Sequence, residues 1–198
     1  MHVLHKRGEK SIFLRSAYQV DFAGFLKKGF VKEHLNFGAR TTINKLVKGE
    51  TIRLDLPELE NTIIFAHIND KGLGTVIICD KDYPESAAVK ILLELQKKFL
   101  DFYSMDLFEK YVGDQEMKFP EIETMIVKYQ DPKEADKLIK IESELAEIQG
   151  MLHKTMNDLL DRGEKLDDLM KQSEDISNMA YNFYSNAKKT NQKCCSLY

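Results

Sequence analysis

The sequence has no tryptophan, only 4 prolines, 10 glycines and 3 cysteines among its 198 residues. No apolar run approaches the roughly 18 residues that a membrane-spanning helix needs, and the first residues, MHVLHKRGEK, lack the long apolar stretch of a signal peptide. Basic and acidic residues nearly balance and form no basic block, so nucleic acid is not an expected partner. We expect the chain to be made and to stay in the cytosol, or to reach membranes by another route.

Chemical signatures are also sparse. The histidines show no catalytic or metal-ligand spacing, and the P-loop, zinc-protease and nucleophile-elbow motifs are absent. The sequence therefore predicts no enzyme, no catalytic residue, no metal site and no cofactor. Cys79 lies in an apolar strand-like run and is expected to be a buried free thiol. Cys194 and Cys195 are adjacent and cannot easily bridge each other, so no disulfide framework is expected.

The first part of the chain alternates between strand-like and helix-like patterns. The strand-like runs are KSIFLRSAYQV, TIRLDL, TIIFAHI and LGTVIICD. The runs with helical spacing are GFVKEHLNFGARTTINKLV, ESAAVKILLELQKKFLDFY and EIETMIVKY, the second of which follows a proline that suits a helix start. The expected order is strand, strand, helix, three strands, helix, helix. This order favours an antiparallel sheet with helices packed on it, an α+β fold.

After Pro132 the chain has no proline, and its dominant pattern is a heptad. Steps of three and four residues from Leu138 never lose register, and most of the positions reached are apolar. This seam comprises Leu138, Ile141, Leu145, Ile148, Leu152, Thr155, Leu159, Arg162, Leu166, Leu169, Ser173, Ile176, Ala180, Phe183, Ala187 and Thr190. An unbroken seam of this length predicts a left-handed coiled coil. Because one narrow stripe is buried only against partner helices, the segment is expected to be loosely ordered or folded back until they arrive.

Arg162 is the one permanently charged residue on the seam. Removing one partner from a buried ionic site costs about 3–5 kcal/mol, so a buried Arg162 requires acceptors on the facing helices. A polar layer of this kind fixes register and partner number, because any slip leaves it unpaired. The alternative is that Arg162 extends into solvent from an exposed helix.

Several stretches together resemble a known family. The seam with its central arginine, in LLDRGEKLDDL, resembles the SNARE motif of an R-SNARE. DKDYPESAAVKILLELQKKF resembles part of a longin domain, and the tail CCSLY resembles a double-cysteine lipidation signal. With YQDPKEADK at the junction, nearly the whole chain is similar to the prenylated longin R-SNAREs of the Ykt-six type.

The resemblance implies three parts. Residues 1–128 would form a longin (profilin-like) domain, a five-stranded antiparallel sheet with helices on both faces. Its first strand would be short, because the chain starts where the family's first strand is already under way. Residues 131–191 would form a long R-SNARE helix, and residues 192–198 a lipidated tail. Arg162 would meet three glutamines from three partner SNARE helices, and zippering of this four-helix bundle would draw two membranes together.

The resemblance also implies regulation and location. A longin groove that includes a phenylalanine of the first helix would hold the chain's own SNARE segment and its lipid. By position this residue is Phe37, although Phe37 could equally be an ordinary core residue. The implied steps are ER–Golgi, intra-Golgi, endosomal–vacuolar and autophagosomal transport. The protein would then occupy a cytosolic pool and the cytoplasmic face of Golgi, ER-derived vesicle, endosomal or vacuolar membranes.

The tail predicts the route to the membrane. Cys195 begins a C-a-a-X sequence and is the expected prenylation site, although Tyr198 departs from the usual last residue. Cys194 is the expected site of a second lipid, by resemblance a palmitate or another prenyl group. One chain gives only marginal binding, so firm anchoring takes two signals. The alternative is an unmodified pair of surface thiols.

A second class of function fits the same pattern. The chain could be a non-fusogenic tether or regulatory binding module, with a longin-like domain that captures partners and a coiled coil that dimerises. A homodimer would set Arg162 against Arg162, which is unfavourable. The heteromeric bundle is therefore preferred.

Overall fold

The computed structural model describes residues 1–21, 23–24, 27–56, 61–137 and 151–194. The chain divides into two compact units. The first comprises Met1–Gln19 and Ala39–Leu159, and the second comprises Val20–Gly38 and Leu160–Tyr198. Helix α1 (Lys28–Lys45) contributes its first part to the second unit and its last part to the first.

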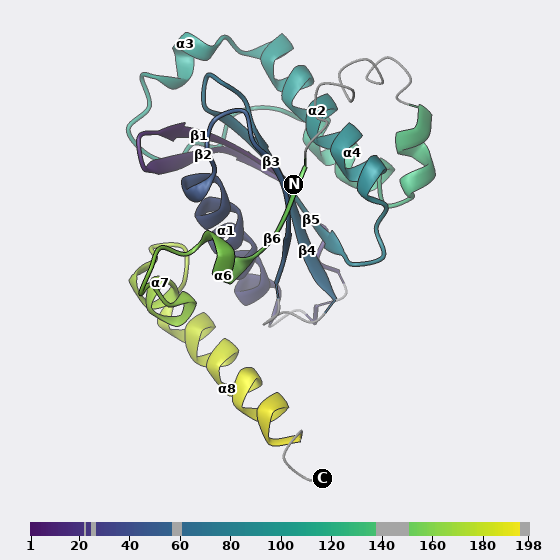
Figure 1. The fold of residues 1–198 in the computed structure, drawn as a ribbon. Helices are drawn as coiled ribbons and strands as arrows, with labels where there is room; N and C mark the ends of the chain where they lie inside the picture. Colours follow the sequence, from purple (N-terminus) through teal and green to yellow (C-terminus); the bar gives the residue numbers. More distant parts are fainter. Residues whose placement is uncertain (22, 25–26, 57–60, 138–150, 195–198) are drawn as a thin grey trace. The chain divides into compact units, whose positions relative to one another are not determined.

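The first unit is built on one sheet with the strand order β2-β1-β5-β4-β3-β6 (Figure 1). Strands β1 to β5 pair antiparallel, as expected for a longin domain. The strands are β1 (His2–Arg7), β2 (Lys10–Ser16), β3 (Thr51–Asp55), β4 (Thr62–Ile68), β5 (Leu73–Asp80) and β6 (Leu152–Thr155). The four strand-like runs of the sequence correspond to β2, β3, β4 and β5, so these predictions are confirmed.

The prediction of a five-stranded, wholly antiparallel sheet is incomplete. The sheet has a sixth strand, β6, which pairs parallel with β3 and comes from the heptad segment. Without β6, strand β3 would end the sheet with a row of unpaired backbone N–H and C=O groups. A segment that has no helical partner can satisfy its own backbone groups at that edge, which explains why the sheet is mixed.

Helices cover both faces of this sheet. On one face, α2 (Glu85–Phe102) follows Pro84 and packs on β5, where Thr75 Oγ1 donates to the Leu92 carbonyl at 3.2 Å. On the other face, the last part of α1 packs so closely that a Cβ on Gly74 would lie 2.6 Å from Ile43 Cδ1. Only glycine allows this approach. The prediction of helices on both faces is confirmed.

The remaining helices of the first unit are short. α4 (Glu121–Lys128) matches its predicted range, whereas α3 (Met105–Phe108) was not predicted. The 3-10 helix η1 (Pro132–Lys137) lies where the long SNARE helix was predicted to begin. α6 (Met156–Leu159) directly follows β6. Among the residues that the structure describes, no helix is both long and apolar enough to cross a membrane.

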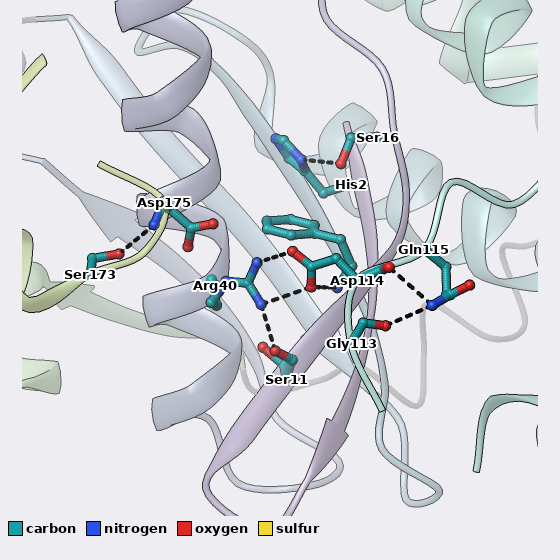
Figure 2. A network of polar contacts seen from close by, with 10 residues as sticks. His2, Ser11, Ser16, Arg40, Gly113, Asp114, Gln115, Ser173 and Asp175 are labelled. Carbon is teal, nitrogen blue, oxygen red and sulfur yellow. Dashed lines mark hydrogen bonds and ion pairs between the residues drawn. The ribbon is translucent and has the colours of Figure 1, made fainter. Parts of the chain in front are cut away.

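The free edge of β2 is covered by the loop around residue 115. Gln115 N–H donates to Phe13 O at 2.7 Å, and Met117 N–H donates to Leu14 O at 2.9 Å. The Arg40 guanidinium holds this loop through two bonds to the Asp114 carboxylate, at 3.0 and 2.5 Å (Figure 2). The same guanidinium lies 4.4 Å from the Phe13 ring centre. Both edges of the five-stranded sheet are thus occupied, β2 by this loop and β3 by β6.

The second unit contains two further helices, α7 (Leu166–Gln172) and α8 (Asn178–Cys194). The prediction of one long SNARE helix is therefore wrong for this form, because residues 151–194 form a strand and three separate helices. A lone a/d stripe gives a continuous helix nothing to bury against. Gly163, at φ 93°, also interrupts the helical path between α6 and α7 with a conformation that disfavours other residues.

Candidate functional site

Strand β6 brings the heptad segment onto β3. The register runs from Ile52 opposite Leu152 to Asp55 opposite Thr155. His153 Nδ1 lies 3.4 Å from the Arg53 guanidinium, and His153 Nε2 lies 3.5 Å from a Glu85 carboxylate oxygen. Such exposed charged contacts contribute little. The backbone ladder therefore carries most of this attachment.

Thr155 ends β6 and directly precedes α6. Its N–H and its hydroxyl both donate to Asp158 Oδ2, each at 2.7 Å. These two bonds hold the pKa of the Asp158 carboxyl below its ordinary value, and the bond from the backbone N–H has the larger effect. Thr155 is a polar position of the seam, and here the Asp158 carboxylate holds it at the start of α6 instead of its being buried in a layer.

Arg162 lies in the exposed turn between α6 and α7. Asp161 N–H donates to Glu164 Oε2 at 2.8 Å, and Gly163 supplies the positive φ that the turn needs. In this form Arg162 is neither helical nor buried. Its predicted position in a bundle layer is therefore not part of this structure, and its charge is left in water.

Phe37 lies in a cluster made of two parts of the chain that are distant in sequence. This buried side chain packs with Met170 of α7 and with three residues at or on α8. The complete buried set is Phe37, Met170, Ile176, Ala180 and Tyr184, with Phe30, Leu166, Leu169 and Tyr181 packed partly buried around it. This cluster is distinct from the core beneath α2. Among the seam residues, the structure thus brings Leu166, Leu169, Ile176 and Ala180 to the helix that carries Phe37.

Polar contacts complete the second unit. Ser177 N–H donates to Glu33 Oε2 at 2.8 Å, and Ser177 Oγ accepts from Ala180 N–H at 3.2 Å, which caps α8. Lys188 lies 3.2 Å from Asp167 and joins α8 to α7. Slight burial lowers the pKa of Lys188, but hydrogen bonding to Asp167 acts in the opposite direction, and the net shift is upward. These bonds fix where α8 begins and how it lies on α7.

The other seam positions differ in how far they are buried. Leu159 is buried, whereas Leu152 is 43% exposed, and Thr155 and Phe183 are exposed. Ser173 is half-buried and its hydroxyl accepts from Asp175 N–H at 3.1 Å (Figure 2). Backbone positions on α8 are known for Ala187, Thr190 and Cys194. Leu138, Ile141, Leu145, Ile148 and Cys195 lie outside the described residues.

Cys79 is a free thiol, as predicted, but it is half-buried rather than buried. Burial first, and the neighbouring Asp80 carboxylate second, raise its pKa to about 12. It is therefore a thiol at neutral pH and a poor nucleophile. Within the described residues, no group of three or more His, Cys, Asp or Glu side chains could hold a metal ion.

Sequence reasoning missed three buried residues, Met156, Met170 and Tyr184. None of them is on the seam. The available signal was their spacing, since each stands one residue after a seam position and two heptads from the next. A lone methionine or tyrosine beside a seam gives no such signal by itself.

Comparison with known proteins gives the family. The synaptobrevin family matches residues 137–196, and the longin family, described as a regulated-SNARE-like domain, matches residues 23–126. Synaptobrevin homolog ykt6 of Schizosaccharomyces pombe is 35% identical over 93% of this chain and 90% of its own length. Synaptobrevin homolog YKT6 of Candida glabrata is 34% identical over 96% and 91%. Its Saccharomyces cerevisiae counterpart is 31% identical over 98% and 96%.

These similarities cover both parts of the chain at once. The longin match covers most of the sheet unit, and the synaptobrevin match covers the heptad segment with β6, α6, α7 and α8. SNARE proteins are not enzymes, so the prediction of a non-enzymatic protein is confirmed. The chain belongs to the Ykt6-type synaptobrevin homologs, longin-containing R-SNAREs of vesicle fusion.

Proposed function

We propose that the chain exchanges its folded-back form, called the closed form below, for one continuous helix in a four-helix SNARE bundle. In that bundle Arg162 meets three glutamines from three partner helices, and zippering along the seam brings a vesicle and its target membrane together. The longin domain holds the segment closed and helps to target the chain. Residues 1–128, 131–191 and 192–198 are then the regulatory domain, the fusion motif and the lipidated tail.

The observation that supports this proposal is that two seam residues would be buried in both states, but against different partners. Ile176 and Ala180 are buried beside Phe37 in the closed form. A fusion bundle must bury the same side chains between its four helices. One side chain cannot occupy both places, so the two states exclude each other and the closed form opposes assembly. Here Phe37 acts as a groove residue and not merely as part of the domain core.

Arg162 fits this exchange because its surroundings change. In the closed form its charge is in solvent, where it needs no partner. In the bundle the partner glutamines supply acceptors to the guanidinium, and a shifted register would leave it buried without them. The same residue therefore costs nothing in the closed form and selects the correct partners in the bundle.

The tail supplies the membrane attachment. We place a prenyl group on Cys195 and a second, palmitoyl or prenyl, lipid on Cys194, since two lipids are needed for firm anchoring. Lys188, Lys189 and Lys193 add weak attraction to anionic lipid. The transport steps proposed are ER–Golgi, intra-Golgi, endosomal–vacuolar or autophagosomal, with a cytosolic pool in reserve.

Assembly with partner helices tests the bundle. The full chain is mixed with glutamine-bearing SNARE motifs of the same genome, singly and in threes, and followed by circular dichroism and analytical ultracentrifugation. We expect a gain in helicity and one copy of the chain per complex only when three partners are present. A gain on self-association alone would support the tether instead.

The variant Arg162→Leu tests the central layer. Because Arg162 is exposed in the closed form, the free energy of unfolding should change by less than about 0.5 kcal/mol. Self-association should increase, since an apolar layer no longer penalises wrong partners. A variant that stays monomeric on ultracentrifugation would count against the polar-layer role, and Arg162→Lys is the charge-preserving control.

Intact mass tests the anchor. The protein is purified from its own cells in cytosolic and membrane fractions. A prenyl mass on Cys195 in both fractions, with a second lipid in the membrane fraction, is the expected result. An unlipidated chain in both fractions would remove the anchor from the proposal.

A further inference from the structure

The heptad segment carries a second column of residues beside its seam. If the seam positions are labelled a and d, the residue after each d position is e. The e positions whose burial the structure describes are Met156, Gly163, Met170, Ser177 and Tyr184. Large apolar or aromatic residues alternate with small ones, so that the large residues recur every second heptad.

The large residues of the e column are buried, whereas the seam residue directly before each of them is exposed or half-buried. Met156 is 1% exposed and Met170 is 2% exposed, and Tyr184 is also buried. The d residues directly before Met156 and Tyr184, Thr155 and Phe183, are exposed. In the closed form the segment therefore presents a face that is rotated from the a/d seam toward e.

Each large e residue lies on a different helix. Met156 begins α6, Met170 lies on α7 and Tyr184 lies on α8. Met170 and Tyr184 both belong to the cluster around Phe37, and the Tyr184 ring lies 5.7 Å from the His34 ring. Every helix of the closed segment thus has one such anchor.

The small residues of the column lie where the helices are interrupted. Gly163 takes φ 93° in the turn between α6 and α7. Ser177 precedes α8 and caps it through its hydroxyl. The alternation of the e column therefore matches the alternation of helix and turn in the closed segment.

We infer that the e column is the binding surface by which the segment holds its own longin domain, and that this surface is separable from the fusion seam. The inference rests on the proposed function. In a four-helix bundle the e positions flank the buried seam, where charged residues are usual. Large apolar side chains there are unexplained by the bundle but are accounted for by the closed form. Methionine suits this use because its flexible, unbranched side chain fits irregular surfaces.

The seam also contributes to the closed form, through Leu159, Ile176 and Ala180. A change at those residues would damage both states. The e column differs because it should matter to one state only. This difference makes the inference testable with matched substitutions.

The test uses three variants of the full, unlipidated chain. Met156→Gln/Met170→Gln alters the e column. Met179→Gln makes the same chemical change at a residue of α8 that is 68% exposed. Leu152→Gln alters a seam residue that is 43% exposed in the closed form. Hydrogen exchange is measured on each chain alone, and the melting temperature is measured on each complex with the three partner SNARE motifs.

The e-column variant should exchange the amides of β6, α7 and α8 roughly tenfold faster or more. Exchange in β4 and β5 should be unchanged, which shows that the sheet still folds, and the complex should melt as the wild type does. Met179→Gln should change neither measurement. Leu152→Gln should lower the melting temperature of the complex and change exchange less than the e-column variant does.

Two results would overturn the inference. One is unchanged exchange in the e-column variant, or in Met170→Gln alone if the double variant does not fold. The other is a complex that loses as much melting temperature as with Leu152→Gln. A wild-type chain that forms no complex with any partner set would instead overturn the proposed function, and with it the separability from a fusion seam, while the exchange data still decide whether the e column holds the closed form.

Discussion

The hairpin β4–β5 and the heptad segment show two different relations between pattern and structure. In β4 and β5 the apolar runs of the sequence become buried strands with an antiparallel register that runs from Thr62–Asp80 to Ile68–Gly74. In residues 151–194 an equally regular pattern becomes a strand and three short helices. The heptad is the longer pattern of the two, yet it predicts this form less well.

The reason lies in where the partners of each pattern are. The strands pair within the chain, so their pattern is satisfied as soon as the domain folds. In the proposed bundle the seam pairs with helices of other chains, so its pattern describes a state that the isolated chain does not reach. A sequence pattern thus predicts a structure only together with the partners that it requires.

The largest effect is expected from breaking the sheet unit. Phe65 is fully buried in β4, and Phe65→Ala should lower the free energy of unfolding by about 3–5 kcal/mol. Calorimetry should show a lower melting temperature for the whole chain. The exposed Val112 gives the control, and Val112→Ala should change it little. Equal effects of the two variants would contradict this core assignment.

A local effect is expected at the Phe37 cluster. Phe37→Ala should weaken the closed form by about 3 kcal/mol, because it removes the ring that Met170, Ile176 and Ala180 surround. Hydrogen exchange in α7 and α8 should rise, while exchange in β4 and β5 should not. A uniform loss of protection across the sheet would mean that Phe37 is an ordinary core residue.

A smaller effect of opposite sign in the two states is expected at Gly163. Alanine at φ 93° is strained, so Gly163→Ala should destabilise the closed form by about 1–2 kcal/mol. In a continuous helix the same change should stabilise by about 1 kcal/mol. Assembly with partner helices should therefore become faster and the complex more stable. Slower assembly would show that the turn is not what opposes the bundle.

Near neutral pH the smallest effect on stability is expected at Cys79. Because its pKa is raised from 9.0 to about 12, the folded chain retains the proton longer than the unfolded chain. Its contribution to stability is therefore complete below pH 9 and is lost as the pH rises toward 12. At pH 8 iodoacetamide should label Cys79 slowly in the folded chain and quickly in urea. Equal rates would contradict its partial burial.

Much of the first unit could be predicted from sequence, since local periodicity and internal pairing agree there. Strands β2 to β5, helices α1, α2 and α4, and the free thiol of Cys79 all follow from short stretches of sequence. The ion pair between Arg40 and Asp114 could not be predicted, because it joins residues that are distant in the chain. Strand β6 could not be predicted either. Leu152 and Thr155 fit the heptad pattern, and only the fold shows that the edge of β3 is available to pair with their backbone.

The Phe37 cluster was predicted only in part, because it joins residues that are distant in the chain. The position of Phe37 on the first helix came from resemblance, and its contact with Ile176 and Ala180 needed the fold. The e column needed both, since its spacing is visible in sequence but its burial is not. The exposed turn at Arg162 is the opposite of what the seam alone indicates.

The most direct measurement is a reversible lock on the closed form. Arg53 and His153 are register partners whose side chains point to the same side, with nitrogens 3.4 Å apart. Arg53→Cys/His153→Cys, in a chain with its native cysteines replaced, should form a disulfide that holds β6 on β3. We predict that the oxidised chain does not assemble with the three partner helices and that reduction restores assembly, whereas Arg53→Cys alone is insensitive to oxidation. An oxidised chain that assembles as fast as the reduced one would contradict the claim that the two states exclude each other.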